Sequence, residues 1–426
     1  MKLYTILAGA LLLTPPMLAA DNLVGFPEAA ANYQAYPDAE SITPPTPAPD
    51  GYKAFHIEHY GRHGSRWLIG EERYQYPVDI LEMARRNGAL TPRGAEVLAE
   101  LKPLREAARG RDGELTDIGA RQHREIARRM AWNFPTVFEP GTRLDARSTI
   151  VIRCILSMLN EIQELTAIYN DLDVHTDASA ADMYYMNNPV PTPSWKRVEA
   201  TKDSLEAFRD RYPVRGDFAR VLISDTRLIA DSVDIKKLNN DLFDIAANSV
   251  SHGPQSDIAN IFSPLEIHEQ WLRTNAFWFW RSGNWSVTGG KAANNHVALL
   301  HDIVNSADTA LMSPRQSVNL RFGHESILMP LVILFEIDDF ARPYPSLESL
   351  VSPSGDGDWR NYQVFPMAAN IQLIFYRPKS GDYTPDDILV KAMLNEREVR
   401  LPAEPVSGTY YRWCDLRERY LAKNGD

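Results

Sequence analysis

The order of strand-like and helix-like segments along this 426-residue chain constrains its fold more than any other feature. Short apolar or alternating segments predict strands near the front of the chain and again in its tail, at 53–58, 142–146, 317–322, 371–376, 388–394 and 398–401. Helical periodicity fills the intervening sequence, at 76–87, 92–108, 120–133 and 153–169. Strands at both ends with helices between them predict an α/β sheet domain interrupted by a second, mainly helical domain.

The predicted domain boundaries follow from changes in this pattern. A leader covers residues 1–20, a proline-rich arm 21–52, an α/β core 53–170 and 301–426, and a mainly helical insertion 171–300. The arm is expected to lie extended on the domain rather than to form a helix. Four tryptophans gather in the insertion, and we expect a packed helical core there rather than a ligand cleft: Trp271, Trp278, Trp280 and Trp285.

The leader has the composition of a secretory signal peptide. Lys2 precedes an apolar run from Leu3 to Leu13, and small residues follow at Ala19 and Ala20. This run is too short to span a bilayer, and no other segment approaches the roughly 20 uninterrupted apolar residues of a membrane helix. The sequence therefore predicts an exported, soluble protein, periplasmic or secreted, with no membrane contact.

Charge and cysteine content narrow the classes of partner. The formal net charge is −11, and removal of the leader with its single Lys2 leaves −12. Such a protein repels a nucleic-acid backbone, so no DNA or RNA partner is expected, and no obligate protein partner is evident. An anionic small substrate is still compatible with this negative net charge if local arginines make the electrostatic potential positive inside one cleft. The two cysteines, Cys154 and Cys414, define no disulfide scaffold; Cys154 is expected in the core, and a bridge between them stays an alternative.

One short segment carries recognisable chemistry: Arg62-His63-Gly64-Ser65-Arg66, directly after the first predicted strand. Transfer of a phosphoryl group needs positive charge around its oxygens and a nucleophile in line with the leaving oxygen. Arginine supplies planar, permanently charged donors for those oxygens. A histidine between two arginines has its cationic form disfavoured, so its imidazole stays neutral and nucleophilic. A chance basic surface turn is the alternative reading.

This segment resembles the signature of the histidine phosphatase superfamily, in its acid phosphatase branch. Three later segments also resemble motifs of that branch, in the same order and with similar spacing: Leu115-Thr116-x-x-Gly119-x-x-Gln122, Ser148-Thr149-x-x-x-Arg153 and Phe322-Gly323-His324-Glu325. The resemblance spans roughly residues 50–400. It implies a phosphoglycerate-mutase-like sheet domain flanked by helices.

The resemblance also implies a role for each matching residue. His63 would attack phosphorus and form a phosphohistidine, while Arg62, Arg66 and Arg153 bind the phosphate oxygens with a hydrogen bond from His324. Glu325 would protonate the leaving alkoxide and then activate water, which requires its pKa to rise toward the working pH. No cofactor and no metal is implied, because the guanidiniums supply the charge that a cation would otherwise provide.

Further features resemble bacterial members of the multiple inositol polyphosphate phosphatase group: the leader, the proline-rich arm, His59-Tyr60-Gly61 and Leu394-Asn395-Glu396. That group usually carries His-Ala-Glu and many other acid phosphatases carry His-Asp, whereas this chain has His324-Glu325-Ser326. The leading hypothesis is a phosphomonoester hydrolase acting on inositol polyphosphates such as phytate. The alternatives are a broad-specificity acid or sugar-phosphate phosphatase, and a phosphate- or phosphosugar-binding protein that has lost turnover.

Several other polar residues also have predicted places or roles. His56, His59 and His63 lack the close carboxylates or cysteines of a metal site, and His59 is expected to support the pocket or pack in the core. His123 is expected at the surface or at an interface, and Ser148-Thr149 as a helix cap. The candidates for substrate contact are Asp182, Tyr184, Tyr185 and Asn187. The candidates for a positively charged rim around the pocket are Lys196, Arg197 and Arg215.

Overall fold

The structure of the protein is a computed structural model that describes residues 23–187, 191–253, 256–351, 359–380 and 382–425. The predicted leader at 1–20 lies outside the described residues. Within those ranges, no helix combines the length and the apolar character that crossing a membrane requires.

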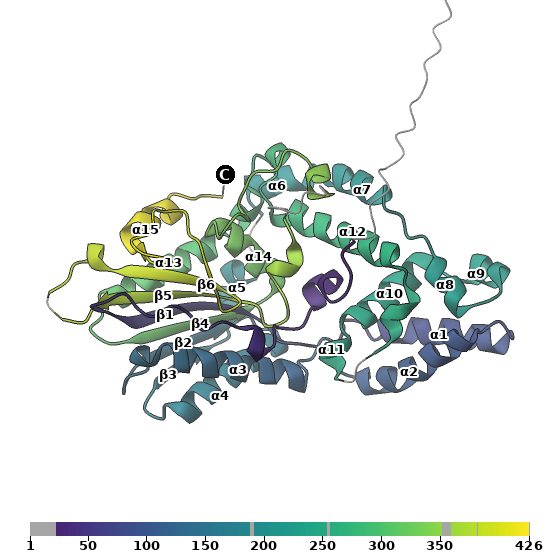
Figure 1. The fold of residues 1–426 in the computed structure, drawn as a ribbon, viewed down its shortest axis with the longest axis horizontal. Coiled ribbons are helices and arrows are strands. Elements are labelled where there is room, and N and C mark those ends of the chain that lie inside the picture. The colour runs from purple at the N-terminus through teal and green to yellow at the C-terminus, as the bar shows by residue number, and fades with distance from the viewer. Residues whose placement is uncertain (1–22, 188–190, 254–255, 352–358, 381, 426) are drawn as a thin grey trace, which may run out of the picture.

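A mixed sheet of eight strands forms the centre of the described chain, in the order β3-β2-β4-β1-β5-β6-β7, with β8 paired to β6 (Figure 1). The strands are β1 (Tyr52–Arg62), β2 (Arg143–Ser148), β3 (Asp173–Asp177), β4 (Ser317–Gly323), β5 (Asn370–Pro378), β6 (Leu389–Leu394), β7 (Arg397–Val399) and β8 (Tyr411–Arg412). Strands β1, β4, β2 and β3 are parallel to one another, and β5 pairs antiparallel with β1. The predicted α/β class and all six predicted strands are confirmed.

Helices cover both faces of this sheet and also form a separate group beside it (Figure 1). Their bounds are α1 (Glu72–Arg86), α2 (Pro92–Ala108), α3 (Asp117–Asn133), α4 (Ile152–Ile168), α5 (Met183–Met186), α6 (Pro193–Glu199), α7 (Lys202–Asp210), α8 (Asp217–Leu222), α9 (Thr226–Ser232), α10 (Ile235–Ala247), α11 (Ser249–His252), α12 (Pro264–Ser282), α13 (Val297–Leu311), α14 (Glu325–Leu334) and α15 (Trp413–Leu421). Helices α3 and α4 pack on one face of the sheet, and α13, α14 and α15 pack on the other.

The chain divides differently from a simple insertion. Helices α1 and α2 share an apolar core with α8 and α10, away from the sheet, and β3 joins the sheet beside β2. The domain boundaries at 170 and 301 stay a prediction. The four tryptophans of the insertion are buried, as expected for a packed core.

Threonine side chains cap two helices: α2 begins at Pro92 as predicted, and α3 begins at Asp117, three residues before the predicted start. Thr91 accepts a hydrogen bond from the Gly94 N–H at the start of α2, and Thr116 accepts one from the Gly119 N–H at the start of α3. The cap predicted at Ser148-Thr149 is wrong, because α4 begins at Ile152 with Val151 as its N-cap. Thr149 is still bound to the sheet edge, where its N–H donates to the Phe322 carbonyl oxygen at 3.0 Å.

The N-terminal arm differs from the extended conformation predicted for it. Residues Glu28–Tyr33 and Ala39–Ser41 form 3-10 turns, whereas the proline-rich 42–49 is extended. The first of these turns lies between the sheet and the separate helical group (Figure 1, purple). The arm therefore runs past the end of the sheet at which β1 finishes.

The two cysteines are free thiols in the described chain, so the alternative of a bridge is wrong. Cys154 is fully buried on α4, as predicted, and Cys414 is partly exposed on α15.

Candidate active site

The predicted site residues meet at one edge of the sheet because three parallel strands end there together. Arg62 at the end of β1 is paired in register with Gly323 at the end of β4, and Ser148 at the end of β2 is paired with Phe322. The His63 N–H donates to the Gly323 carbonyl oxygen at 2.9 Å. The crevice beyond the carboxyl ends of parallel strands is the usual ligand site of such sheets.

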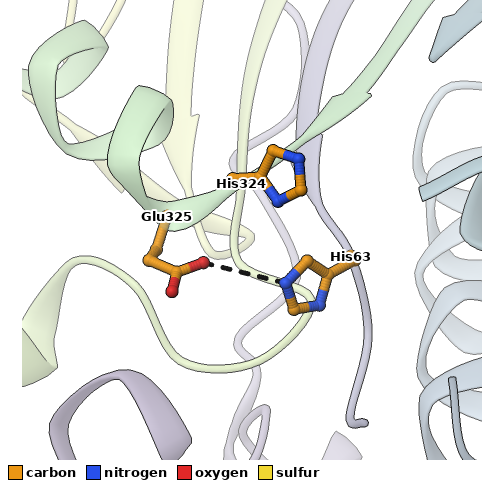
Figure 2. A group of neighbouring side chains, drawn as sticks. All are labelled: His63, His324 and Glu325. Atoms are coloured by element: carbon orange, nitrogen blue, oxygen red, sulfur yellow. Dashed lines mark ion pairs between the residues drawn. The ribbon is translucent and has the colours of Figure 1, made fainter. Parts of the chain in front are cut away.

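His63, His324 and Glu325 converge in this crevice from opposite ends of the sequence (Figure 2). His63 follows β1, while His324 and Glu325 join β4 to α14. The Nε2 atom of His63 lies 3.7 Å from Oε2 of Glu325, and the two imidazole rings are 5.6 Å apart at a steep angle. Residues separated by 261 positions thus share one pocket.

The environment of His63 makes its imidazole a neutral base with one free nitrogen. Its Nδ1 lies 2.9 Å from the Gly64 carbonyl oxygen. Because that oxygen can only accept, Nδ1 carries the proton and Nε2 keeps its lone pair. Burial lowers the pKa of His63 well below its usual range, and the charges of Arg62 and Arg153 lower it further.

The loop that carries His63 is supported by the start of α3. A Cβ on Gly64 would lie 2.5 Å from the Gly119 carbonyl oxygen, so only glycine fits at this approach. The Gln122 side chain accepts from the Ser65 N–H at 2.9 Å, and the Thr116 N–H donates to the Ser65 carbonyl oxygen. This explains the Thr-x-x-Gly-x-x-Gln spacing: these residues support the loop that carries His63.

Three arginines reach the pocket with donor groups that are still free. Arg62 uses Nη1 to donate to the carbonyl oxygens of Asn32 and Phe365, at 2.7 and 2.8 Å. Within the described chain, these three arginines carry four buried guanidinium nitrogens without a hydrogen-bond partner: Arg62 Nε and Nη2, Arg66 Nε and Arg153 Nε. Burial lowers the pKa of Arg62 to about 10. Buried unpaired donors are costly, and an oxyanion would satisfy them with charge-assisted hydrogen bonds.

The Glu325 carboxyl group is ionised in this arrangement, contrary to the raised pKa expected from the sequence. Burial alone raises its pKa, but the charges of Arg62 and Arg66 outweigh burial and bring it to about 2. The Arg62 Nε atom lies 3.1 Å from Glu325 Oε2. The sign of this shift depends on the balance between burial and two arginines.

His324 is a neutral, buried neighbour of the same pocket. Burial lowers its pKa to about 4 against the opposing charge of Glu325. Its Nε2 lies 3.4 Å from Thr149 Oγ1 and 3.7 Å from Cys154 Sγ, and its backbone N–H donates to the Tyr60 hydroxyl. These contacts fix the ring beside His63.

His63, His324 and Glu325 are also close enough to share a metal ion, with ligand atoms within 4.8 Å of one another. The charges of Arg62, Arg153 and Arg66 all act on the same imidazole and oppose a cation there. The donor set and the surrounding charge therefore suit an anion better than a metal.

Comparison with known proteins identifies the fold. No family model matches the chain. Human multiple inositol polyphosphate phosphatase 1 is 22% identical over 338 residues, which cover 72% of this chain. The structure of Bifidobacterium longum multiple inositol polyphosphate phosphatase in complex with phosphate aligns with a TM-score of 0.73 at 19% identity, covering 93% of this chain and 98% of that one. The phytase from D. castellii aligns with a TM-score of 0.68 at 13% identity, covering 93% of this chain and 86% of that one.

The chain has the histidine acid phosphatase fold. It is a homologue of the human phosphatase and spans 66% of that protein's length. The resemblance inferred from the four motifs is confirmed.

Three residues that reach this pocket were missed by the sequence reasoning. Arg281, at the end of α12, lies over the Trp195 ring at 5.2 Å, and the charge of Glu325 raises its pKa against the lowering by burial. Asn32 and Tyr33 of the arm contact Glu325 and Arg66. The only signal in the sequence is that Arg281 ends a strongly aromatic helical run, and nothing marks the arm residues.

Other polar candidates lie elsewhere or have structural partners. His123 does not lie at the surface, one of the two places expected for it: its side chain is buried and its Nδ1 lies 2.8 Å from Glu161, which also faces His59 at 4.0 Å. Tyr185 accepts a hydrogen bond from Arg147, and Arg215 forms an ion pair with Glu269.

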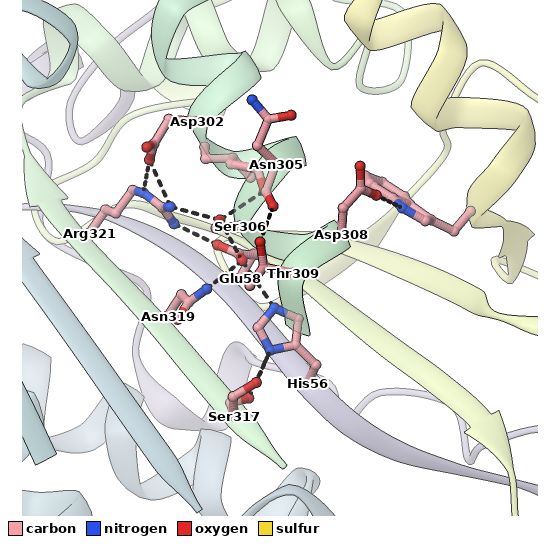
Figure 3. Close-up of polar contacts among 12 residues, drawn as sticks. His56, Glu58, Asp302, Asn305, Ser306, Asp308, Thr309, Ser317, Asn319 and Arg321 are labelled. Atoms are coloured by element: carbon pink, nitrogen blue, oxygen red, sulfur yellow. Dashed lines mark hydrogen bonds and ion pairs between the residues drawn. The ribbon is translucent and has the colours of Figure 1, made fainter. Parts of the chain in front are cut away.

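A second buried polar cluster lies further back on the same strands and ties β1 to β4 and α13 (Figure 3). Glu58 of β1 forms an ion pair with Arg321 of β4 at 2.5 Å and also contacts His56 at 3.0 Å. Ser306 and Asn319 donate to the same carboxylate at 2.8 and 2.6 Å. This cluster holds the strand that carries His63 and offers no free donor to a ligand.

Replacing Glu58 by glutamine is expected to lower the free energy of unfolding by about 3–5 kcal/mol, because it leaves a buried Arg321 without its main counter-charge. The pKa of Glu58 is lowered in the folded protein: burial raises it, but Arg321 and His56 together outweigh burial. Its stabilisation is therefore present above the unfolded pKa, about 4.3, and is lost as pH falls through the folded value. Urea unfolding between pH 3 and pH 7 measures this difference.

A matched control for this variant is Asp145→Asn, which breaks the exposed pair with Arg143 on neighbouring β2 and should cost less than about 1 kcal/mol. Equal losses for the two variants, or a Glu58→Gln loss that grows at acidic pH, would contradict the assignment.

Proposed function

We propose that this chain hydrolyses phosphate monoesters through a phosphohistidine on His63, with inositol polyphosphates such as phytate as its substrate class. One observation carries the proposal: the free Nε2 of a neutral imidazole lies among three arginines, each of which has at least one buried N–H group without a partner in the described chain. An imidazole in that state is a nucleophile, and those N–H groups are suited to phosphate oxygens.

In the first step, His63 Nε2 attacks phosphorus, the P–N bond forms and the ester P–O bond breaks. Arg62, Arg66 and Arg153 bind the oxygens on which charge develops. The leaving alkoxide takes a proton from Glu325. In the second step, water attacks the phosphohistidine while Glu325 accepts its proton, and inorganic phosphate leaves with His63 regenerated.

Glu325 has to move and gain a proton for this chemistry. Its Oε2 lies 3.7 Å from His63 Nε2, within the space that a phosphorus atom needs at an attack distance of roughly 3–3.5 Å. A bound phosphate therefore displaces Oε2 from this position. The same dianion offsets the charges of Arg62 and Arg66, which are what hold the Glu325 pKa at about 2. Substrate binding thus raises the pKa of the proton donor.

Two observations support a substrate with several phosphates. The human relative is a multiple inositol polyphosphate phosphatase, and the Bifidobacterium longum protein of that name has been captured with inositol hexasulfate. In this chain, Arg281 of α12 carries a further positive charge that interacts electrostatically with Glu325. Export through the leader predicted at 1–20 remains part of the proposal and rests on the sequence alone.

A substrate panel tests this function. We expect kcat/KM for phytate to exceed that for glucose 1-phosphate and for a nucleoside monophosphate by about 10-fold or more, since extra phosphates add charge-assisted contacts worth about 1.5–3 kcal/mol each. Release of inorganic phosphate between pH 4 and pH 7 measures the rates. Comparable rates on all three substrates would favour a broad acid phosphatase. Binding of inorganic phosphate without hydrolysis of any of the three esters would favour a binding protein.

A further inference from the structure

The arm reaches the catalytic carboxyl group directly. The Asn32 side chain donates from Nδ2 to Glu325 Oε1 at 3.3 Å, across 293 positions of sequence. The backbone oxygen of the same residue accepts from Arg62 Nη1 at 2.7 Å. One residue of the arm therefore contacts both the predicted proton donor and the arginine that faces it.

The two oxygens of Glu325 have different partners, and this difference is informative. Oε2 faces the Nε atom of Arg62 and the Nε2 atom of His63, whereas Oε1 receives the amide of Asn32. A phosphate at the nucleophile displaces Oε2 but leaves Oε1 beside the arm. An amide that donates to Oε1 favours the proton on the other oxygen, because the carbonyl-type oxygen of a protonated carboxyl group accepts a hydrogen bond better than its hydroxyl oxygen does.

We infer that Asn32 is a positioning residue, which holds Oε1 of Glu325 so that Oε2 is the oxygen that protonates the leaving group. This inference rests on the proposed function and adds to it a residue outside the four motifs. It also assigns the N-terminal arm a role in turnover.

The backbone around Asn32 supports this assignment. Ala31, directly before it, is buried with a φ of 50°, in the left-handed region that residues with a side chain rarely adopt. Strained residues of this kind persist where the surroundings hold them, and they cluster at functional sites. On the other side of Asn32, the Tyr33 ring lies 5.5 Å from the Arg66 guanidinium.

The arm is anchored independently of the Asn32 side chain. The Val24 N–H donates to His268 Nδ1 at 3.0 Å, and the Met367 N–H donates to the Gln34 carbonyl oxygen at 2.7 Å. The Tyr36 hydroxyl donates to Glu396 at 2.9 Å. Substitutions at Asn32 therefore remove the amide while the arm and the backbone contact with Arg62 stay in place.

The experiment compares two substrates whose leaving groups differ in their need for a proton. Asn32→Ala is expected to lower kcat/KM for phytate about 10-fold and kcat/KM for p-nitrophenyl phosphate less than about 2-fold, because p-nitrophenolate leaves without a proton and kcat/KM leaves out the later hydrolysis of the phosphohistidine. Asn32→Asp keeps the size but cannot donate, so its loss on phytate should be at least as large. Ser41→Ala, an exposed residue of the same arm that bonds only locally to the Asp38 carbonyl oxygen, is the control.

A double-mutant cycle separates positioning from a structural effect. In a Glu325→Gln background, Asn32→Ala should change kcat/KM for phytate less than about 2-fold, because the group that it positions is already absent. Equal losses on both substrates, additive losses in the cycle, or full activity of Asn32→Asp would overturn the inference. A wild type without turnover on either substrate would instead overturn the proposed function, and the inference with it.

Discussion

Replacing His63 by alanine is expected to lower kcat/KM for p-nitrophenyl phosphate by about 10⁴–10⁶-fold, the loss that follows removal of a covalent nucleophile. The imidazole is the group with a free nitrogen at the centre of the three arginines. Neither a water molecule nor a neighbouring side chain can replace it in line with the ester oxygen. Steady-state release of p-nitrophenol measures the loss.

The same variant should keep its affinity for inorganic phosphate within about 10-fold, because the guanidiniums that bind the anion are unchanged. Calorimetric titration tests this and also shows that the pocket is still folded. His175→Ala, which removes an exposed imidazole on β3, is the matched control and should retain full activity. Substantial turnover by His63→Ala would refute a phosphohistidine, and so would an alkaline quench of wild type that finds no phosphoryl group on the His63 peptide.

The sheet could be predicted from the sequence because its central strands are buried on both faces. β1, β5 and β6 are continuous runs of buried residues, and such runs are recognisable without a partner strand. β3 was missed because it is an edge strand of mostly polar, exposed residues, Asp173–Asp177. β8 contains only two residues and has no periodicity to detect.

The centre of the site could be predicted because its residues follow strands that are parallel and in register. Once β1, β2 and β4 are placed side by side, His63, Thr149 and His324 must share an edge. Contacts that depend on a particular tertiary path were not predictable. The bond from Asn32 to Glu325 and the burial of His123 against Glu161 are examples, because neither pair has a distinctive sequence spacing.

The sign of the Glu325 pKa shift was also beyond sequence reasoning. The role implied for Glu325 requires a raised pKa, whereas Arg62 and Arg66 together lower the pKa of this carboxyl group in the structure. These arginines are the groups that a phosphate would neutralise, so in the proposed mechanism substrate binding raises the pKa of Glu325. This coupling makes Glu325 the second residue at which a large effect is expected.

Replacing Glu325 by glutamine should lower kcat/KM for phytate by about 10²–10⁴-fold, the usual contribution of a general acid, and kcat/KM for p-nitrophenyl phosphate by less than about 10-fold. The ratio kcat/KM reports the steps up to the phosphohistidine and leaves out its hydrolysis, in which Glu325 acts on both substrates alike. An alkoxide needs the proton, whereas p-nitrophenolate does not. KM for both substrates should fall or stay unchanged, since the substitution removes the carboxylate that competes with phosphate for Arg62. Initial rates on the two substrates, in parallel with the exposed control Glu348→Gln, measure the difference.

The pH dependence gives the same residue a second, independent test. In the free protein the pKa of Glu325 is about 2, and only the protonated carboxyl group can donate. The fraction of protonated Glu325 therefore falls as pH rises, so kcat/KM of wild type for phytate should decline from pH 4 to pH 7. Glutamine cannot titrate, so Glu325→Gln should lose that part of the decline and retain only the part due to the ionisation of the substrate. Equal losses on phytate and p-nitrophenyl phosphate, with an unchanged pH profile, would mean that another group protonates the leaving oxygen.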